Sequence, residues 1–137
     1  MPQIAALSIA DGESTPVSHV FNPIATNPKP QWRRNGVSVP AVGMERLETD
    51  TKLATTANGV HKHTMSLVIP VMEQTSGGTS AGYVAPPGVA HELKGVINLF
   101  NHQRSTKQDR KNLRVLLANW LLSAAAASQI DDLEKPY

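Results

Sequence analysis

Cysteine is missing from the chain, so disulfide bridges, thiolate metal ligands and cysteine nucleophiles are excluded. Long hydrophobic runs are missing too, because no segment reaches the roughly 18 consecutive apolar residues of a membrane span. Neither sign of charge dominates, since 13 Lys and Arg stand against 11 Asp and Glu. The 40% hydrophobic content of the 137 residues is enough for one core. These features predict a single soluble, cytosolic domain with no membrane partner, and they permit a polyanionic partner without requiring one.

Patterns that support catalysis or metal binding are also few. His61 and His63 share one strand face, but no carboxylate or third histidine stands at ligand spacing, so an exposed basic turn is the simpler interpretation. No G-x-S-x-G motif frames a serine nucleophile, and no lysine follows the glycines of TSGGTSAG (75–82) as in a phosphate loop. Arg33 and Arg34 could contact nucleic acid, although a solvated loop pair is the more common explanation. We expect no enzyme activity, metal, cofactor or small-molecule substrate.

The N-terminal part of the chain indicates a hairpin followed by a loop. Short apolar stretches at 3–10 and 17–21 flank Asp11-Gly12, a pair typical of hairpin turns. Residues 22–36 contain three prolines and end in Asn-Gly. Because proline cannot donate to a strand ladder, this segment is predicted to be a loop, with Trp32 as a candidate plug.

A second hairpin is predicted around Asn58-Gly59. Polar and apolar residues alternate through 44–56, as they do in a strand with one buried face. Asn58-Gly59 predicts a type I′ turn with positive φ angles, so the stretch that follows is the antiparallel partner strand. The apolar face of that partner holds Met65, Leu67 and Ile69, and the opposite face holds Lys62, Thr64, Ser66 and Val68.

The C-terminal part indicates helices. Residues 89–103 are ambiguous, since their apolar positions fit either a helical stripe or a strand face, and periodicity alone favours a helix. A clear helix follows at about 106–126, with Ser105 and Gln108 as a capping box, and Ser128 caps a second helix at about 128–135. The first helix has an apolar stripe wider than one small sheet requires, which suggests contacts with a partner as well as core packing: Leu113, Leu116, Leu117, Trp120 and Leu121.

Several segments follow one another in an order typical of a known family: the Asp-Gly hairpin, VPAVGMERLETDT, HKHTMSLVIPVMEQTSGG, and the closing STKQDRKNLRVLLANWLL and QIDDLEKPY. Together they resemble the coat proteins of single-stranded RNA bacteriophages, the leviviruses, and especially the Q-beta-like type. The closing segments are the most specific, and residues 22–43 match poorly.

The resemblance implies an α+β fold in one domain over 1–137. Its parts are an N-terminal β-hairpin, an antiparallel five-stranded sheet, all strands lying within about 3–103, and two C-terminal helices. Two subunits would form an interlocked dimer in which each lays its helices over the partner's sheet. The resemblance also makes 89–103 a strand, and Gly95 in mid-segment would cost a helix about 1 kcal/mol. We therefore expect a strand at 89–103.

The resemblance further implies a capsid protein that dimerises and assembles into an icosahedral shell enclosing the phage RNA. Assembly would take place in the bacterial host cytoplasm and the product would be the virion. The exposed sheet face would bind an RNA operator hairpin and repress translation of the replicase, and residues 75–82 would form the loop near the symmetry axes. The positions matching the RNA-facing side are Lys52, Lys62, Thr64, Ser66, Lys94 and Asn98. Glu48 and Asp50 depart from the family pattern on that face. The alternative is a non-assembling dimeric RNA-binding regulator.

Overall fold

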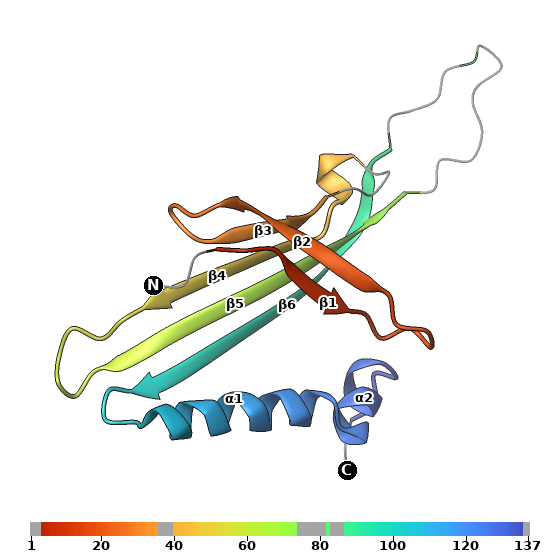
Figure 1. Ribbon diagram of the computed structural model, residues 1–137. Coiled ribbons are helices and arrows are strands. Elements are labelled where there is room, and N and C mark those ends of the chain that lie inside the picture. Colours follow the sequence, from red (N-terminus) through yellow and green to blue (C-terminus); the bar gives the residue numbers. More distant parts are fainter. Residues whose placement is uncertain (1–3, 36–39, 74–81, 83–86, 136–137) are drawn as a thin grey trace. The chain divides into compact units, whose positions relative to one another are not determined.

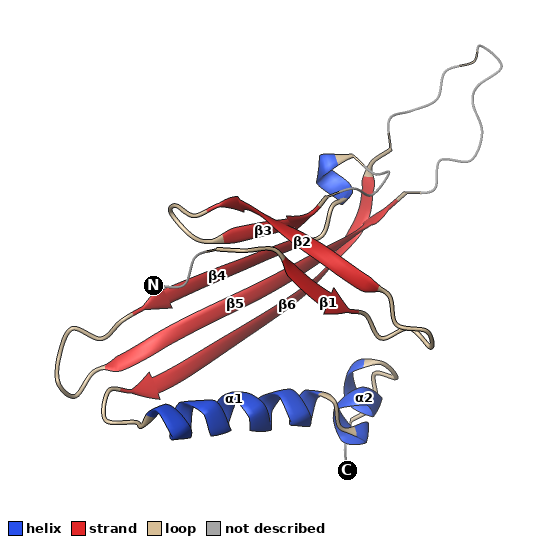
Figure 2. Ribbon diagram, in the orientation of Figure 1, coloured by secondary structure: helices blue, strands red, loops and turns tan. Residues whose placement is uncertain are grey.

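The computed structural model describes residues 4–35, 40–73, 82 and 87–135 (Figure 1). One sheet has the strand order β1-β2-β3-β4-β5-β6, and neighbouring strands follow one another in sequence. The strands are β1 Leu7–Ala10, β2 Ser18–Ala25, β3 Gln31–Arg34, β4 Arg46–Lys52, β5 Val60–Met72 and β6 Val89–His102. Two helices follow, α1 Lys107–Leu121 and α2 Ala124–Ile130 (Figure 2). The predicted α+β fold is confirmed, but the strand count differs. The N-terminal hairpin, β1 and β2, belongs to the sheet, and four further strands complete it in place of the expected five.

The chain divides into two compact units. The first comprises Met1–Lys52 and Lys62–Leu99, which hold most of the sheet. The second comprises Leu53–His61 and Phe100–Tyr137, which hold the β4–β5 loop, the end of β6 and both helices. Within the second unit, the Gln103 N–H donates to the Gly59 carbonyl at 3.1 Å and ties the loop to the turn after β6.

The prediction of a loop at 22–36 is wrong, because β2 runs on to Ala25 and β3 begins at Gln31. Pro23 pairs with Trp32 next to a register irregularity between Pro23 and Ala25. Proline is tolerated in a strand at such a position, since no regular ladder bond depends on its missing N–H. Trp32 is therefore a strand residue, and its indole N–H donates to the Ala5 carbonyl at 2.8 Å.

The Asn58-Gly59 turn also differs from its prediction. Residues 53–59 form a longer loop, and neither Asn58 nor Gly59 has a positive φ. The Gly59 N–H donates to the Thr56 carbonyl at 2.9 Å, and the Ala54 N–H donates to His61 Nδ1 at 3.0 Å. Glycine is needed for space instead, because a Cβ on Gly59 would lie 2.5 Å from the Ala54 Cβ.

The segment at 89–103 is a strand, as the resemblance led us to expect: β6 covers Val89–His102 and lies beside β5 in the sheet. The long helix predicted at 106–126 is divided: α1 ends at Leu121, and Ser123 begins α2 by accepting the Ala126 N–H at 3.3 Å. A serine side chain that bonds to nearby backbone favours helix ends over helix interiors.

The predicted helix caps are displaced as well. Thr106 and Asp109, one residue after the predicted pair, form the capping box of α1. Ser128 lies inside α2, which ends at Ile130, so the predicted helix at 128–135 is wrong in both bounds. Residues 75–81 of the expected loop lie outside the described residues.

Little of the described chain is buried. The buried apolar residues in that part of the chain are Phe21, Pro70 and Ala126, and Asn101 is buried among the polar ones. Large apolar side chains of both units remain exposed, including Met65 at 44% and Trp120 at 61%. Exposed apolar area of this extent is typical of surfaces that bind another molecule.

Candidate nucleic-acid interface

The strand register brings four of the predicted RNA-facing residues together. In the β4–β5 pair, Lys52 lies opposite Lys62, Asp50 opposite Thr64, and Glu48 opposite Ser66. Side chains two residues apart in a strand point to the same face. Lys52, Lys62, Thr64 and Ser66 therefore share one face of the sheet, which we call the polar face, and Leu47, Thr49, Met65 and Leu67 share the other.

β6 adds Asn98 and Lys94 to the polar face. The Thr64 hydroxyl donates to the Asn98 carbonyl oxygen Oδ1 at 2.8 Å. This bond leaves the Asn98 amide N–H groups as donors and a lone pair of the Thr64 oxygen as an acceptor, side by side on an exposed surface. Lys94 lies four residues before Asn98 in the same strand, so the alternation places it on the polar face.

Neighbouring side chains compensate the acidic residues of the polar face. Gln31 Nε2 donates to Glu48 Oε1 at 3.2 Å, and the Lys29 ammonium lies 3.7 Å from Asp50 Oδ2. On the same face, the Arg46 guanidinium pairs with Glu92 at 3.0 Å. Basic residues of the polar face outnumber the carboxylates, which keeps the surface compatible with a polyanion.

Arg33 and Arg34 lie on opposite faces. Arg33 pairs in register with Arg46 and therefore belongs to the polar face, where its Nε is buried with no hydrogen-bond partner in the described structure. Arg34 points to the other face and donates to Glu45 Oε1 at 2.8 Å. From the sequence, Arg33 and Arg34 were considered together as a possible nucleic-acid contact and a solvated loop pair was favoured, because the segment was taken for a loop. The alternation in QWRR, once it is recognised as a strand, would have separated the two arginines.

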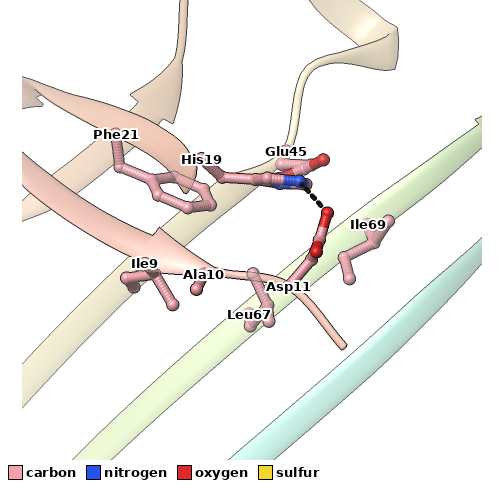
Figure 3. A pocket seen from close by; sticks show the side chains of 8 residues that line it. All are labelled: Ile9, Ala10, Asp11, His19, Phe21, Glu45, Leu67 and Ile69. Carbon is pink, nitrogen blue, oxygen red and sulfur yellow. Dashed lines mark hydrogen bonds and ion pairs between the residues drawn. The ribbon is translucent and has the colours of Figure 1, made fainter. Parts of the chain in front are cut away.

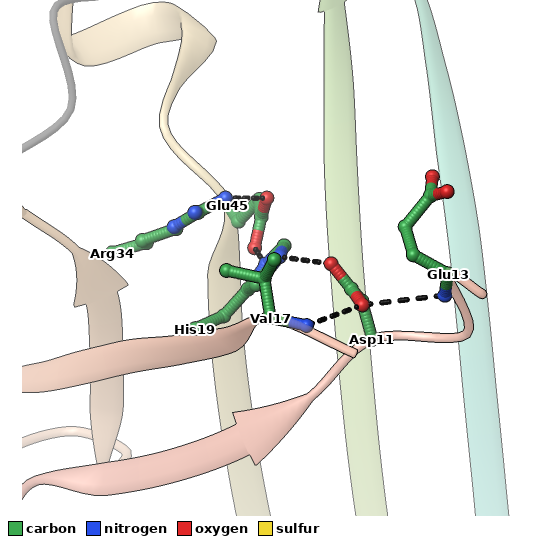
Figure 4. Close-up of polar contacts among 6 residues, drawn as sticks. All are labelled: Asp11, Glu13, Val17, His19, Arg34 and Glu45. Carbon is green, nitrogen blue, oxygen red and sulfur yellow. Dashed lines mark hydrogen bonds and ion pairs between the residues drawn. The ribbon is translucent and has the colours of Figure 1, made fainter. Parts of the chain in front are cut away.

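A histidine clamp holds the N-terminal hairpin to the start of β4. His19 Nδ1 lies 2.8 Å from Glu45 Oε2, and His19 Nε2 lies 3.0 Å from Asp11 Oδ2 (Figure 4). Asp11 also closes the hairpin loop, because its Oδ1 accepts the Val17 N–H at 2.9 Å. Beside the clamp is a small apolar hollow of about 120 Å³, lined by Ile9, Phe21, Leu67 and Ile69 among others (Figure 3).

The charges of the clamp support one another. The pKa of His19 is raised above its ordinary value. The hydrogen bond between His19 and Glu45 is the largest cause and the one between His19 and Asp11 adds to it, while desolvation of the imidazole acts in the opposite direction. The hydrogen bond from the Val17 N–H is the largest cause that lowers the pKa of Asp11. The clamp is therefore strongest when His19 is a cation between two carboxylates.

The predicted helix stripe is present on α1. Leu113, Leu116, Trp120 and Leu121 are exposed, and Leu117 is half-buried. In the described part of the chain, no single helix is long and apolar enough to cross a membrane, and α1 and α2 pass such a test only as a pair bent by 60°. Among the residues described, no three His, Asp or Glu side chains gather as metal ligands.

Comparison with known proteins assigns the chain to a family. The model of the levivirus coat protein matches residues 2–137. The chain belongs to the levivirus coat protein family. It is accordingly a structural protein of the capsid and not a member of an enzyme family.

Solved structures agree with this assignment. The virus-like particle of bacteriophage ESE058 is 27% identical, with a TM-score of 0.89 over 99% of this chain and 100% of the other. The particle of bacteriophage EMS014 is 29% identical, with a TM-score of 0.77 over 93% of this chain and 80% of the other. The bacteriophage GA capsid shares the fold at 17% identity, with a TM-score of 0.72 over 96% and 95% of the two chains. No curated protein sequence matches the chain.

Proposed function

We propose that this coat protein forms an interlocked homodimer, that dimers assemble into an icosahedral shell around phage RNA in the host cytoplasm, and that the polar face binds an RNA hairpin. The whole-chain family match, together with the virus-like particles among its structural neighbours, carries the proposal. Binding to a hairpin at the start of the replicase gene would repress replicase translation and mark the genome for packaging.

Two uncovered apolar surfaces support the dimer. The sheet exposes Met65 on its apolar face, and α1 exposes Leu116 at 67% together with Trp120. A two-fold dimer covers both kinds of surface at once, since the helix of each subunit can pack on the sheet of the other. β6 is the last strand of the sheet, and joining it to the same strand of a second subunit would remove an unpaired edge.

The polar face suits single-stranded RNA because it offers both positive charges and exposed hydrogen-bonding groups. Lys52, Lys62 and Lys94 supply positive charge for phosphates, which determines affinity without sequence reading. The Thr64–Asn98 pair presents a donor beside an acceptor, a pattern that complements an unpaired base carrying an amino group next to a ring nitrogen, as adenine does. Ser66 adds a further hydroxyl on the same strand face.

Assembly is tested by expressing the chain alone. We expect closed particles carrying host RNA in negative-stain micrographs, with matching light scattering across physiological salt. A small soluble dimer with no particles under all of these conditions would overturn assembly and favour the non-assembling RNA-binding regulator.

RNA binding is tested by filter binding of assembly-blocked dimers to the replicase-start hairpin and to a scrambled hairpin over a salt series. Lys62→Ala should weaken the binding of both RNAs equally. The slope of log K against log salt concentration should fall by about 0.7 to 0.9, because one phosphate contact is lost. Thr64→Ala should leave the affinity for the scrambled hairpin unchanged. It should reduce the difference in binding free energy between the replicase-start hairpin and the scrambled hairpin by about 1 to 3 kcal/mol. His91→Ala, an exposed residue of β6 on the face away from Lys94, serves as the control. Unchanged binding by both Lys62→Ala and Thr64→Ala would show that RNA binds elsewhere.

A further inference from the structure

A hollow on the apolar face of the sheet is large enough for one bulky side chain. Its volume is about 360 Å³, and its lining is mostly apolar, with Trp32, Leu47, Met65, Leu67 and Ile97 among the residues that surround it. All of these belong to the unit that holds most of the sheet. The hollow also reaches Gly95 of β6, the one lining position without a side chain.

Nothing in the described chain explains why residue 95 is a glycine. Its φ is not positive, so the backbone conformation is open to any residue. A Cβ built on Gly95 would meet no heavy atom within 4 Å, so crowding does not exclude a side chain. Glycine inside a strand costs about 0.5 to 1 kcal/mol relative to alanine, and it often marks a place where another molecule approaches closely. The space over Gly95 therefore indicates an approach from outside the described chain.

Trp120 has the properties that the hollow requires. It lies on the apolar stripe of α1 and is 61% exposed. Tryptophan is the side chain that most often anchors protein interfaces, where it fills a pocket at their centre.

We propose that Trp120 of each subunit inserts into the hollow over Gly95 of the other subunit, and that residue 95 is glycine to admit the indole ring. This inference rests on the proposed dimer and adds the residue pair that determines its fit. The two-fold symmetry gives two identical seats per dimer, each made of one Trp120 and one Gly95.

The test uses two variants of the full chain with different affinity tags, Gly95→Leu to fill the hollow and Trp120→Ala to remove the ring. Each variant alone should raise the dimer dissociation constant by about 30-fold or more, as truncation of a central anchor does. When the two are coexpressed, the heterodimer contains one seat of wild-type composition and one seat that carries both substitutions, where the smaller side chain leaves room for the larger. We therefore expect tandem-tag purification and native mass spectrometry to give heterodimer well above the statistical half.

The matched control is Gly12→Leu, because a Cβ on Gly12 also meets open space but lies in the β1–β2 loop, away from the hollow. It should dimerise as the wild type does. If either variant fails to fold alone, coexpression should recover a folded heterodimer, and failure to recover one overturns the seat.

The outcomes separate this inference from the proposed dimer. If the wild-type protein is monomeric, both the proposed dimer and the proposed contact between Trp120 and the hollow over Gly95 are wrong. If the wild type is dimeric but the two variants dimerise normally, or form heterodimers only in the statistical proportion, the contact is wrong and the dimer is still supported. Loss of folding in both variants with no recovery on mixing would place Trp120 in the hollow of its own chain.

Discussion

Removing the His19 clamp should loosen the N-terminal hairpin, and the structure indicates by how much. The His19 side chain is 20% exposed and that of Glu45 is 14% exposed, so their 2.8 Å contact is largely shielded from water. A hydrogen bond between charged groups contributes about 1.5 to 3 kcal/mol to stability. Arg34 remains bonded to Glu45 at 2.8 Å after the change, which limits the cost of leaving that carboxylate behind. We expect His19→Ala to lower the free energy of unfolding by about 2 kcal/mol.

The clamp also has a defined pH dependence. Because the pKa of His19 is raised above its ordinary 6.5, the stabilisation is complete below that value and is lost as the pH rises through the raised pKa. The pKa of Asp11 is lowered from 3.8, so its contribution is present above that value and is lost as the pH falls through the lowered pKa. The clamp is therefore most effective at mildly acidic pH.

Urea unfolding followed by tryptophan fluorescence, at about pH 6 and about pH 9, measures the effect. Wild-type protein should lose more stability between these values than His19→Gln, which keeps a hydrogen-bonding group but cannot become a cation. His91→Ala, at an exposed position, should follow the wild type. If the free energy of unfolding changes equally with pH in the wild type and in His19→Gln, the idea that a cationic His19 holds the hairpin is refuted.

Three further predictions concern single residues. Arg33→Ala should weaken RNA binding with little loss of stability, whereas Arg34→Ala should lower stability and leave RNA affinity unchanged; the reverse in filter binding and urea unfolding would contradict their assignment to opposite faces. Glu48→Gln removes a negative charge from the polar face, so non-specific RNA affinity should rise and its salt dependence should steepen, and an unchanged salt titration would show that Glu48 does not face the RNA. Thr106→Ala removes the N-cap of α1 and should cost about 1 kcal/mol in urea unfolding; no loss would mean that the capping box contributes nothing to stability.

The candidate site could be predicted from alternation because the two sides of a strand are determined by its period of two. Met65 and Leu67 lie on one face and Thr64 and Ser66 on the other, as the register of β5 against β4 confirms. The role of these residues in RNA binding stays a prediction, as does the dimer role of the α1 stripe. Periodicity alone favoured a helix at 89–103, where the apolar positions fit both a helix and a strand, and that interpretation was wrong. The family resemblance correctly predicted a strand.

What the sequence determined by itself was therefore local: the alternation of β4 and β5, the hairpin turn at Asp11-Gly12, and the apolar stripe of α1. The tertiary structure decided where long-range pairing outweighs local preference. It turned the proline-rich 22–36 into two strands with Arg33 on the polar face, since β3 gains ladder bonds from both neighbours. It ended α1 at Leu121, because Ser123 caps a second helix. It also brought Glu45 to Asp11 and His19 of the N-terminal hairpin, because only the folded sheet places the hairpin beside the start of β4.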